Sequence, residues 1–201
     1  MISWIRPPKF FRGIYPSSLW NCWLQQDVLF TFDDGPGPHT EELLNLSQEY
    51  NVKFVFFILP KQAEKYPEII RRIVKNGHIM GSHFSKHRRH IMDTKETLLS
   101  SLNESVEMIE EISRNTIKYS RVPYGRLLPW QDGWINKVGY THVFWSLDSK
   151  DYNLEPSEKV INRFRNNIQS DDIVLFHDGE SAHPQIVQIV EECLKSLNLE
   201  L

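Results

Sequence analysis

Two adjacent carboxylates, Asp33 and Asp34, lie where an apolar stretch at 27–32 runs into a Gly-Pro turn. The side chains of a strand alternate between its two faces, but a turn directly after the strand can aim neighbouring acids into one space. Because adjacent carboxylates repel each other, the pair favours a division of labour in which one acid binds a metal ion and the other takes a proton. A solvated turn is the alternative, since Asp-Gly-Pro is also ordinary turn chemistry.

A histidine-rich segment offers further metal ligands. His83 and His87 are four residues apart, a spacing that places two imidazoles on one side of a helical turn. Together with Asp34 they would form a three-ligand site with open positions for water and substrate, which is the layout of a catalytic zinc site. A solvated basic loop is the alternative interpretation of the two histidines.

The sequence also offers a base and an acid for such a metal site. Asp33 could act as general base if Arg121 lies nearby, because a guanidinium keeps a carboxylate ionised and oriented. His177 follows an apolar run, and a hydrogen bond to Asp148 or Asp151 would raise its pKa and keep it protonated as a general acid. A surface salt bridge for Arg121 and a core position for His177 are the alternatives.

A metal, a base and an acid together favour hydrolysis of an acyl bond. The tetrahedral oxyanion of that reaction would need the metal and a backbone N–H from the turn Pro123-Tyr124-Gly125. Two histidines and one carboxylate also form the iron site of non-haem oxygenases, which is a second interpretation. Oxygenases have no use for an acid–base pair beside the metal, so the hydrolase is favoured.

The elements between these residues must bring them together. Strands are expected at 27–32, 52–58, 78–81, 117–122, 140–147 and 172–176. Helices are expected from 40 over about ten residues, and at 67–75, 93–113, 130–138, 156–168 and 184–197. This alternation predicts right-handed βαβ units and an all-parallel sheet of six strands, one or two short of a closed barrel.

Each cluster of polar residues that holds a candidate catalytic or metal-binding residue follows directly after one of these strands. In barrels and open parallel sheets, the active site lies at the carboxyl ends of the strands. So many polar clusters at such positions are improbable by accident. The expected fold and the expected site therefore support each other.

Composition and charge limit the number of domains and the kinds of binding partner that the chain can have. With 201 residues, 40% of them hydrophobic, the chain is expected to form one domain with a sizeable core, on which the aromatic-rich segment 1–26 packs. A formal net charge of −3 with well-mixed signs indicates neither nucleic acid nor an anionic membrane as partner. Cys22 and Cys193 are expected to be two isolated thiols.

Targeting signals are not seen in the sequence. No apolar run approaches the length of a membrane span, and the opening segment is too short and too soon broken by proline for a signal peptide. We therefore expect a soluble, cytoplasmic protein by default, with export left open. A monomer is the default expectation for its oligomeric state.

Five short motifs occur in order along the chain: TFDDGP at 31–36, HFSKH at 83–87, RVPYG at 121–125, DSKDY at 148–152 and LFH at 175–177. In order and interval they resemble the motifs of the polysaccharide deacetylase family, the NodB-homology domain of carbohydrate esterase family 4. The resemblance runs from Thr31 to about Leu197. It implies a NodB-like domain at 27–201, folded as a distorted (β/α) barrel with about seven parallel strands.

The resemblance also implies roles for the motif residues. Asp34, His83 and His87 would hold a divalent metal, zinc before Co²⁺, Ni²⁺ or Mg²⁺. The other implied roles are Asp33 as general base, Arg121 as the residue that orients it, His177 as general acid, Asp151 as the residue that tunes this acid, Pro123 and Tyr124 as the turn that binds the oxyanion and lines the groove, Leu175 as part of the pocket for the acetyl methyl, and Tyr152 as a wall of the groove.

The implied reaction is hydrolysis of an N-acetyl or O-acetyl group of a carbohydrate, such as a chitin-, peptidoglycan- or envelope-type polysaccharide, with release of acetate. Two positions depart from the family pattern. Phe84 replaces a small hydroxyl residue, so the hydrogen bonds of its loop must differ, and Tyr152 replaces a tryptophan of the groove. Neither change removes a catalytic group, so we expect an active enzyme. A small amide or imide as substrate and an inactive glycan-binding module are the alternatives.

Overall fold

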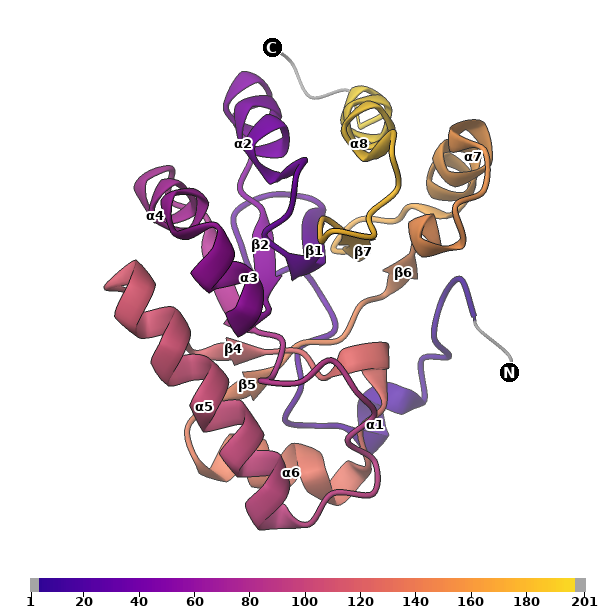
Figure 1. Cartoon of the computed structure of the whole chain (residues 1–201). Helices are drawn as coiled ribbons and strands as arrows, with labels where there is room; N and C mark the ends of the chain where they lie inside the picture. Colours follow the sequence, from indigo (N-terminus) through magenta and orange to yellow (C-terminus); the bar gives the residue numbers. More distant parts are fainter. Residues whose placement is uncertain (1–3, 198–201) are drawn as a thin grey trace.

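The centre of the molecule is a curled, all-parallel sheet (Figure 1). A computed structural model describes residues 4–197 of the chain, and within these residues the sheet has seven strands in the order β5-β4-β3-β2-β1-β7-β6. The strands are β1 (Leu29–Gly35), β2 (Val55–Ile58), β3 (Ile79–Ser82), β4 (Tyr119–Ser120), β5 (Thr141–His142), β6 (Leu147–Asp148) and β7 (Ile173–His177). The predicted α/β fold, a distorted single-domain barrel with about seven parallel strands, is confirmed.

Helices surround the outside of the curled sheet and connect its strands (Figure 1). They are α1 (Phe11–Ile14), α2 (Thr40–Glu49), α3 (Pro60–Lys65), α4 (Pro67–Lys75), α5 (Lys95–Ser113), α6 (Pro129–Lys137), α7 (Ser157–Asn167) and α8 (Ile186–Lys195). The long helix α5 begins after Thr94, whose hydroxyl accepts a hydrogen bond from the backbone N–H of Thr97. This N-cap satisfies one of the donors that a helix start leaves free.

The residues of β1 alternate between two sides, as the period of a strand requires. Phe30 and Phe32 belong to the cluster between the sheet and the helices, where both pack against Phe176. Leu29 belongs to a second, smaller cluster inside the curl. By the same alternation, the side chain of Asp33 points into the curl, so the sheet itself aims the first acid of the pair at the interior.

The prediction of a single strand at 140–147 is wrong, because this stretch forms two strands at opposite edges of the sheet. β5 pairs with β4 at one edge, and β6 pairs with β7 at the other. Between them, Val143 pairs with Leu19 of the N-terminal segment. The stretch changes partner along its length and spans the open side of the curl, which raises the number of strands from six to seven.

Other expected elements are found within a few residues of their bounds, with three exceptions. The strand expected at 117–122 is reduced to Tyr119–Ser120, because its pairing with β3 and β5 lasts for only two residues. The other two are helices that the sequence does not predict, α1 in the N-terminal segment and α3. Helix α3 begins with Pro60 at its first position, where a missing N–H costs nothing.

The N-terminal segment is bound to the open side of the sheet by backbone hydrogen bonds. Leu19 donates its N–H to the carbonyl of His142 at 2.9 Å, and Ile5 accepts from the N–H of Asp148 at 2.8 Å. Cys22 and Cys193 are both free thiols, as expected. Among the described residues, none of the helices has the length and apolar character needed to cross a membrane.

Replacement of Phe30 by alanine tests the central packing. Phe30 is 1% exposed and packs against Phe54, Phe164 and Phe176. We expect the free energy of unfolding in urea to fall by about 3–5 kcal/mol, because the lost ring leaves a cavity. The control is Phe10→Ala, since Phe10 is 64% exposed. A similar small loss in both variants would contradict the placement of Phe30.

Candidate active site

The residues of all five motifs gather at the carboxyl ends of the strands. Their positions are Asp33 and Asp34 at the end of β1, His83 after β3, Arg121 after β4, Asp151 after β6 and His177 at the end of β7. In the register of the sheet, Asp33 lies beside His177 on the neighbouring strand. The sheet therefore brings together residues that are far apart in the sequence.

Asp34, His83 and His87 form a cluster with the chemistry of a metal site. The Nε2 atoms of His83 and His87 lie 3.3 and 3.1 Å from Asp34 Oδ1, and the three ligand atoms lie within 4.8 Å of one another. His83 Nδ1 lies 2.8 Å from the carbonyl oxygen of Arg121. A carbonyl can only accept, so Nδ1 carries the proton and Nε2 presents its lone pair.

The oxygen at the centre of this cluster fits a cation. Asp34 Oδ1 is buried and has no hydrogen-bond partner of good geometry within residues 4–197. Buried polar atoms are nearly always satisfied, so such an atom calls for an ion or a water. Burial tends to raise the pKa of Asp34, but the neighbouring His83 and His87 outweigh it and hold this pKa well below its usual range. The group is thus a carboxylate beside two imidazole nitrogens, a donor set that suits zinc.

Asp33, the second acid, is held by a buried guanidinium. Arg121 is fully buried, and one of its terminal nitrogens donates to Asp33 Oδ1 at 2.8 Å and to Thr31 Oγ1 at 2.7 Å. The guanidinium also donates to the carbonyls of Val143 and Phe144 at 3.0 and 3.2 Å. Arg121 is therefore not a surface ion pair but a fixed partner that orients the carboxylate. The other oxygen, Oδ2 of Asp33, faces His83 Nε2 at 4.0 Å.

Of the two acids considered as partners of His177, Asp151 is the one that binds it. Asp151 Oδ1 lies 2.9 Å from His177 Nδ1, and its Oδ2 accepts the backbone N–H of His177 at 2.8 Å. Burial tends to lower the pKa of His177, but attraction by Asp151, Asp33 and Asp34 outweighs it and raises this pKa to about 10. The imidazole is therefore a cation that can give up a proton from Nε2.

Two tyrosines flank these groups. The ring of Tyr124 lies 4.7 Å from the ring of His87 and is 54% exposed. Tyr124 has a left-handed backbone with φ of 62°, in a turn that starts at the buried Pro123. The ring of Tyr152 stands edge-on to His177 at 5.3 Å. Both rings thus lie where they could contact a substrate at the metal cluster.

Asp148 lies behind Tyr152 and is not the partner of His177. Its Oδ2 accepts the hydroxyl of Tyr152 at 3.2 Å, and its Oδ1 accepts the backbone N–H of Lys150 at 2.9 Å. Burial raises its pKa to about 6. Leu175, 3% exposed, pairs in register with Asp148 on β6 and with Thr31 on β1, which places it between the acid and base sides of the site.

Known proteins resemble this chain in sequence and in fold. A peptidoglycan-N-acetylglucosamine deacetylase of Bacillus cereus is 29% identical over 91% of this chain, which spans 64% of that protein. A chitooligosaccharide deacetylase of Azorhizobium caulinodans is 30% identical over 77% of this chain and 75% of its own length. The crystal structure of a peptidoglycan N-acetylglucosamine deacetylase superposes with a TM-score of 0.86 at 26% identity, covering 96% of this chain and 91% of that one.

The model of the polysaccharide deacetylase family matches residues 22–143, which is more than half of the chain. The chain belongs to the polysaccharide deacetylase family. The family predicted from the five motifs is therefore confirmed. The predicted enzyme class, a carbohydrate deacetylase, is also confirmed. The relatives named above are deacetylases that act on carbon–nitrogen bonds of carbohydrates.

The loop that carries the two histidines differs from the expectation. His83 and His87 do not share a helical turn, because 83–90 contains no helix. Their rings approach to 5.5 Å through the bends of the loop at 85–88. Phe84, the residue of this loop expected to depart from the motif, is buried against His90 and has a left-handed backbone with φ of 64°.

Serines on either side of Phe84 hold this loop by hydrogen bonds. The hydroxyl of Ser82 accepts the N–H of Phe84 at 3.0 Å and donates to Ser105 at 2.8 Å. Ser85 Oγ lies 3.0 Å from Ser101 Oγ. The loop is thus anchored to helix α5 from both sides, and the departure at Phe84 leaves the ligand cluster intact.

Asp178 is a further residue of this site, and it is not among the residues expected from the sequence. It is fully buried, its Oδ2 accepts the hydroxyl of Thr40 at 2.6 Å, and its backbone N–H donates to the carbonyl of Asp33 at 3.1 Å. Burial raises its pKa to about 7. A Cβ at Gly35 would lie 2.2 Å from Asp178 Oδ1, so only glycine fits there. An acid directly after His177 was the available signal.

Replacement of Asp151 by asparagine tests the pairing with His177. The metal-free wild-type protein should keep His177 protonated up to about pH 10. Without the carboxylate charge, we expect the pKa of His177 to fall by about two units, as measured by NMR of the imidazole resonances. Asp148→Asn is the matched control and should move this pKa less. An equal shift in both variants, or none in Asp151→Asn, would contradict the pairing.

Proposed function

We propose that the chain is a metal-dependent deacetylase that hydrolyses N-acetyl groups of an acetylated carbohydrate and releases acetate. The observation that supports this most directly is the gathering of three kinds of group around one space. Asp34, His83 and His87 offer ligands for a cation, Asp33 is held by a buried arginine, and His177 is held by Asp151. A base, an acid and a Lewis acid are what amide hydrolysis requires.

Asp34, His83 and His87 would hold the metal, with zinc as the first candidate and Co²⁺, Ni²⁺ or Mg²⁺ as alternatives. One carboxylate and two imidazoles are typical ligands of catalytic zinc, whereas Mg²⁺ prefers oxygen ligands. When bound, such a cation supplies Lewis-acid polarisation of an acyl carbonyl and lowers the pKa of a water. The arrangement of His83 supports this role, because its proton is committed to the carbonyl of Arg121.

In the proposed reaction, Asp33 takes a proton from the attacking water. Arg121 holds this carboxylate in a fixed orientation, since the guanidinium donates to Oδ1. His177 gives its proton to the nitrogen of the leaving amine when the carbon–nitrogen bond breaks, and Asp151 stabilises the imidazolium before that step. We assign the backbone N–H of Tyr124, in the turn begun by Pro123, to the developing oxyanion.

The remaining residues are proposed to bind the substrate. Tyr124 and Tyr152 would contact the faces of the sugar with their rings, since both are about half exposed beside the histidines. Leu175 would contact the methyl of the acetyl group. The two curated relatives named above act on peptidoglycan N-acetylglucosamine and on chitooligosaccharides, so an N-acetylhexosamine is the proposed unit.

Acetate release tests the proposed reaction. Wild-type protein is incubated with chitooligosaccharides, peptidoglycan and acetylated xylan, and acetate is measured enzymatically. We expect release from at least one N-acetylated glycan, and a decrease of about 10²–10⁴-fold in Asp33→Asn and in His177→Ala, because each removes one proton transfer. Glu107→Gln, an exposed change of charge on α5, is the control. Equal release by all variants would refute the mechanism.

Metal analysis tests the ligand assignment separately. We expect about one divalent ion per chain in wild-type protein by plasma mass spectrometry, and loss of most of it in the double variant His83→Ala/His87→Ala, since one carboxylate remains. A chelator should abolish acetate release, and added zinc should restore it. Stoichiometric metal in the double variant would show that the ion is bound elsewhere.

A further inference from the structure

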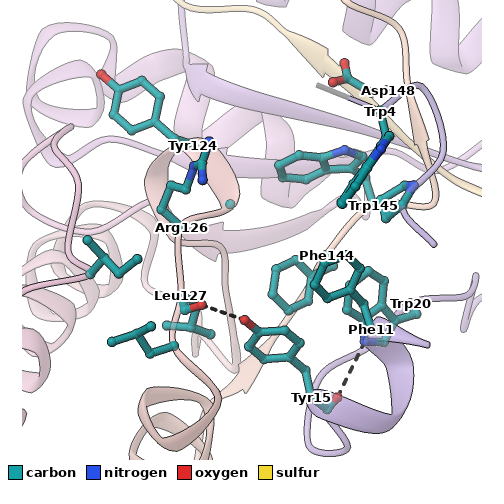
Figure 2. A pocket seen from close by; sticks show the side chains of 14 residues that line it. Trp4, Phe11, Tyr15, Trp20, Tyr124, Arg126, Leu127, Phe144, Trp145 and Asp148 are labelled. Atoms are coloured by element: carbon teal, nitrogen blue, oxygen red, sulfur yellow. Dashed lines mark hydrogen bonds between the residues drawn. The ribbon is translucent and has the colours of Figure 1, made fainter. Parts of the chain in front are cut away.

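A cavity of about 410 Å³ lies between the N-terminal segment and the turn that carries Tyr124 (Figure 2). Tyr124 and Asp148 line one end of it, and these residues also contact His87 and Tyr152 of the active site. Its volume lies in the range of pockets that bind small ligands, which is about 300–1,000 Å³. The cavity is thus continuous with the site at which the acetylated sugar would bind.

Aromatic rings from the N-terminal segment form one wall of this cavity. The ring of Trp4 lies 5.5 Å from Phe11, and Tyr15 lies 5.0 Å from Phe144. Trp20 is stacked on Phe144 at 4.2 Å. Figure 2 shows these rings on one side of the cavity, with Tyr124, Arg126 and Leu127 on the other.

Two hydrogen-bond donors of this aromatic wall, on Tyr15 and Trp20, already point to acceptors within the protein. The hydroxyl of Tyr15 donates to the carbonyl of Leu127 at 2.7 Å, and the indole N–H of Trp20 points to the carbonyl of Tyr15 at 3.5 Å (Figure 2). A sugar hydroxyl placed beside Tyr15 and Trp20 would lose water and find both of these donors already used, and such a loss is costly. An alkyl or aryl group would lose nothing and would gain contact with the rings.

We propose that this cavity binds an apolar substituent, an alkyl or aryl group, that the substrate carries beside its acetylated sugar. The inference rests on the proposed deacetylase function, because continuity with Tyr124 and Asp148 assigns the occupant to the same substrate molecule. Among the described residues the lining has two charged side chains, Arg126, beside Tyr124, and Asp148, which binds the hydroxyl of Tyr152. The glycan part therefore lies at the catalytic end and the apolar part at the aromatic end.

The four rings of this wall lie in the N-terminal segment, outside the residues that match the family model. Trp4, Phe11, Tyr15 and Trp20 all precede residue 22, at which the family match begins. The segment is also held in place before any ligand binds. Arg6 forms an ion pair with Asp172, and backbone hydrogen bonds join Ile5 and Leu19 to the sheet. Such preorganisation lowers the entropy lost on binding.

Binding of an apolar substituent in this cavity should change kcat/KM, although the cavity lies away from the bond that is hydrolysed. An apolar group bound equally in the ground state and the transition state raises kcat/KM. Each methylene buried in the cavity should contribute about fourfold to binding, so an octyl chain that is only partly buried should raise kcat/KM by about tenfold or more.

The test compares methyl and octyl glycosides of di-N-acetylchitobiose as substrates, both below micelle-forming concentration. Wild-type protein should show a ratio of kcat/KM, octyl over methyl, of about ten or more. Ile91→Trp places a large ring in the lining and should reduce the ratio to near one. The matched control is Met92→Trp, since Met92 is 90% exposed and is not part of the lining. It should keep the wild-type ratio.

Each other outcome has a distinct meaning. If wild-type protein hydrolyses both glycosides equally well, the apolar site is refuted and the deacetylase function stands. If added sugar units raise kcat/KM and an alkyl chain does not, the cavity is a saccharide subsite and the proposal is overturned. If neither glycoside is hydrolysed, the deacetylase function fails on this substrate, and calorimetry with octyl glucoside, which has no acetyl group, decides the inference. Binding that Ile91→Trp abolishes and Met92→Trp retains would support it, and absence of binding would refute it.

Discussion

The ion pair between Arg121 and Asp33 connects the chemistry of this protein to its fold. Arg121 is fully buried and donates to β1 through Asp33 and to the chain between β5 and β6 through the carbonyls of Val143 and Phe144. Removing one partner of a buried pair costs about 3–5 kcal/mol, because the other charge is left without compensation. The proposed base is therefore held in place by the same contacts that close the curl of the sheet.

The two neighbouring acids are separated by backbone geometry. Asp33 is a regular strand residue and points into the curl, whereas Asp34 has a left-handed φ of 71° that directs its side chain to His83 and His87. Non-glycine residues rarely adopt this region, and such strain is found at functional sites. Gly35 follows without a side chain and leaves room for Asp178. One turn thus gives two identical side chains different partners.

Much of this site could be predicted from the sequence, because its chemistry is contained in short motifs and their position after strands. The apolar runs located β1 and β7, and the residue types of Asp34, His83 and His87 indicated a metal site. The expected strand at 140–147 failed for a physical reason. A hydrophobic pattern records which residues are buried, but not which neighbour they pair with, and this stretch pairs first with β4 and then with β7.

Periodicity and motif spacing are local properties of the chain, and for that reason they were enough to predict the fold class, the family and the residue types of the site. The folded structure was needed to show that Asp151 rather than Asp148 binds His177, and that the two histidines meet through a loop rather than a helix. It also placed the N-terminal aromatic rings against Phe144 to form the cavity beside the site. These features depend on contacts between residues far apart in the chain, and their burial and distance have no local signature.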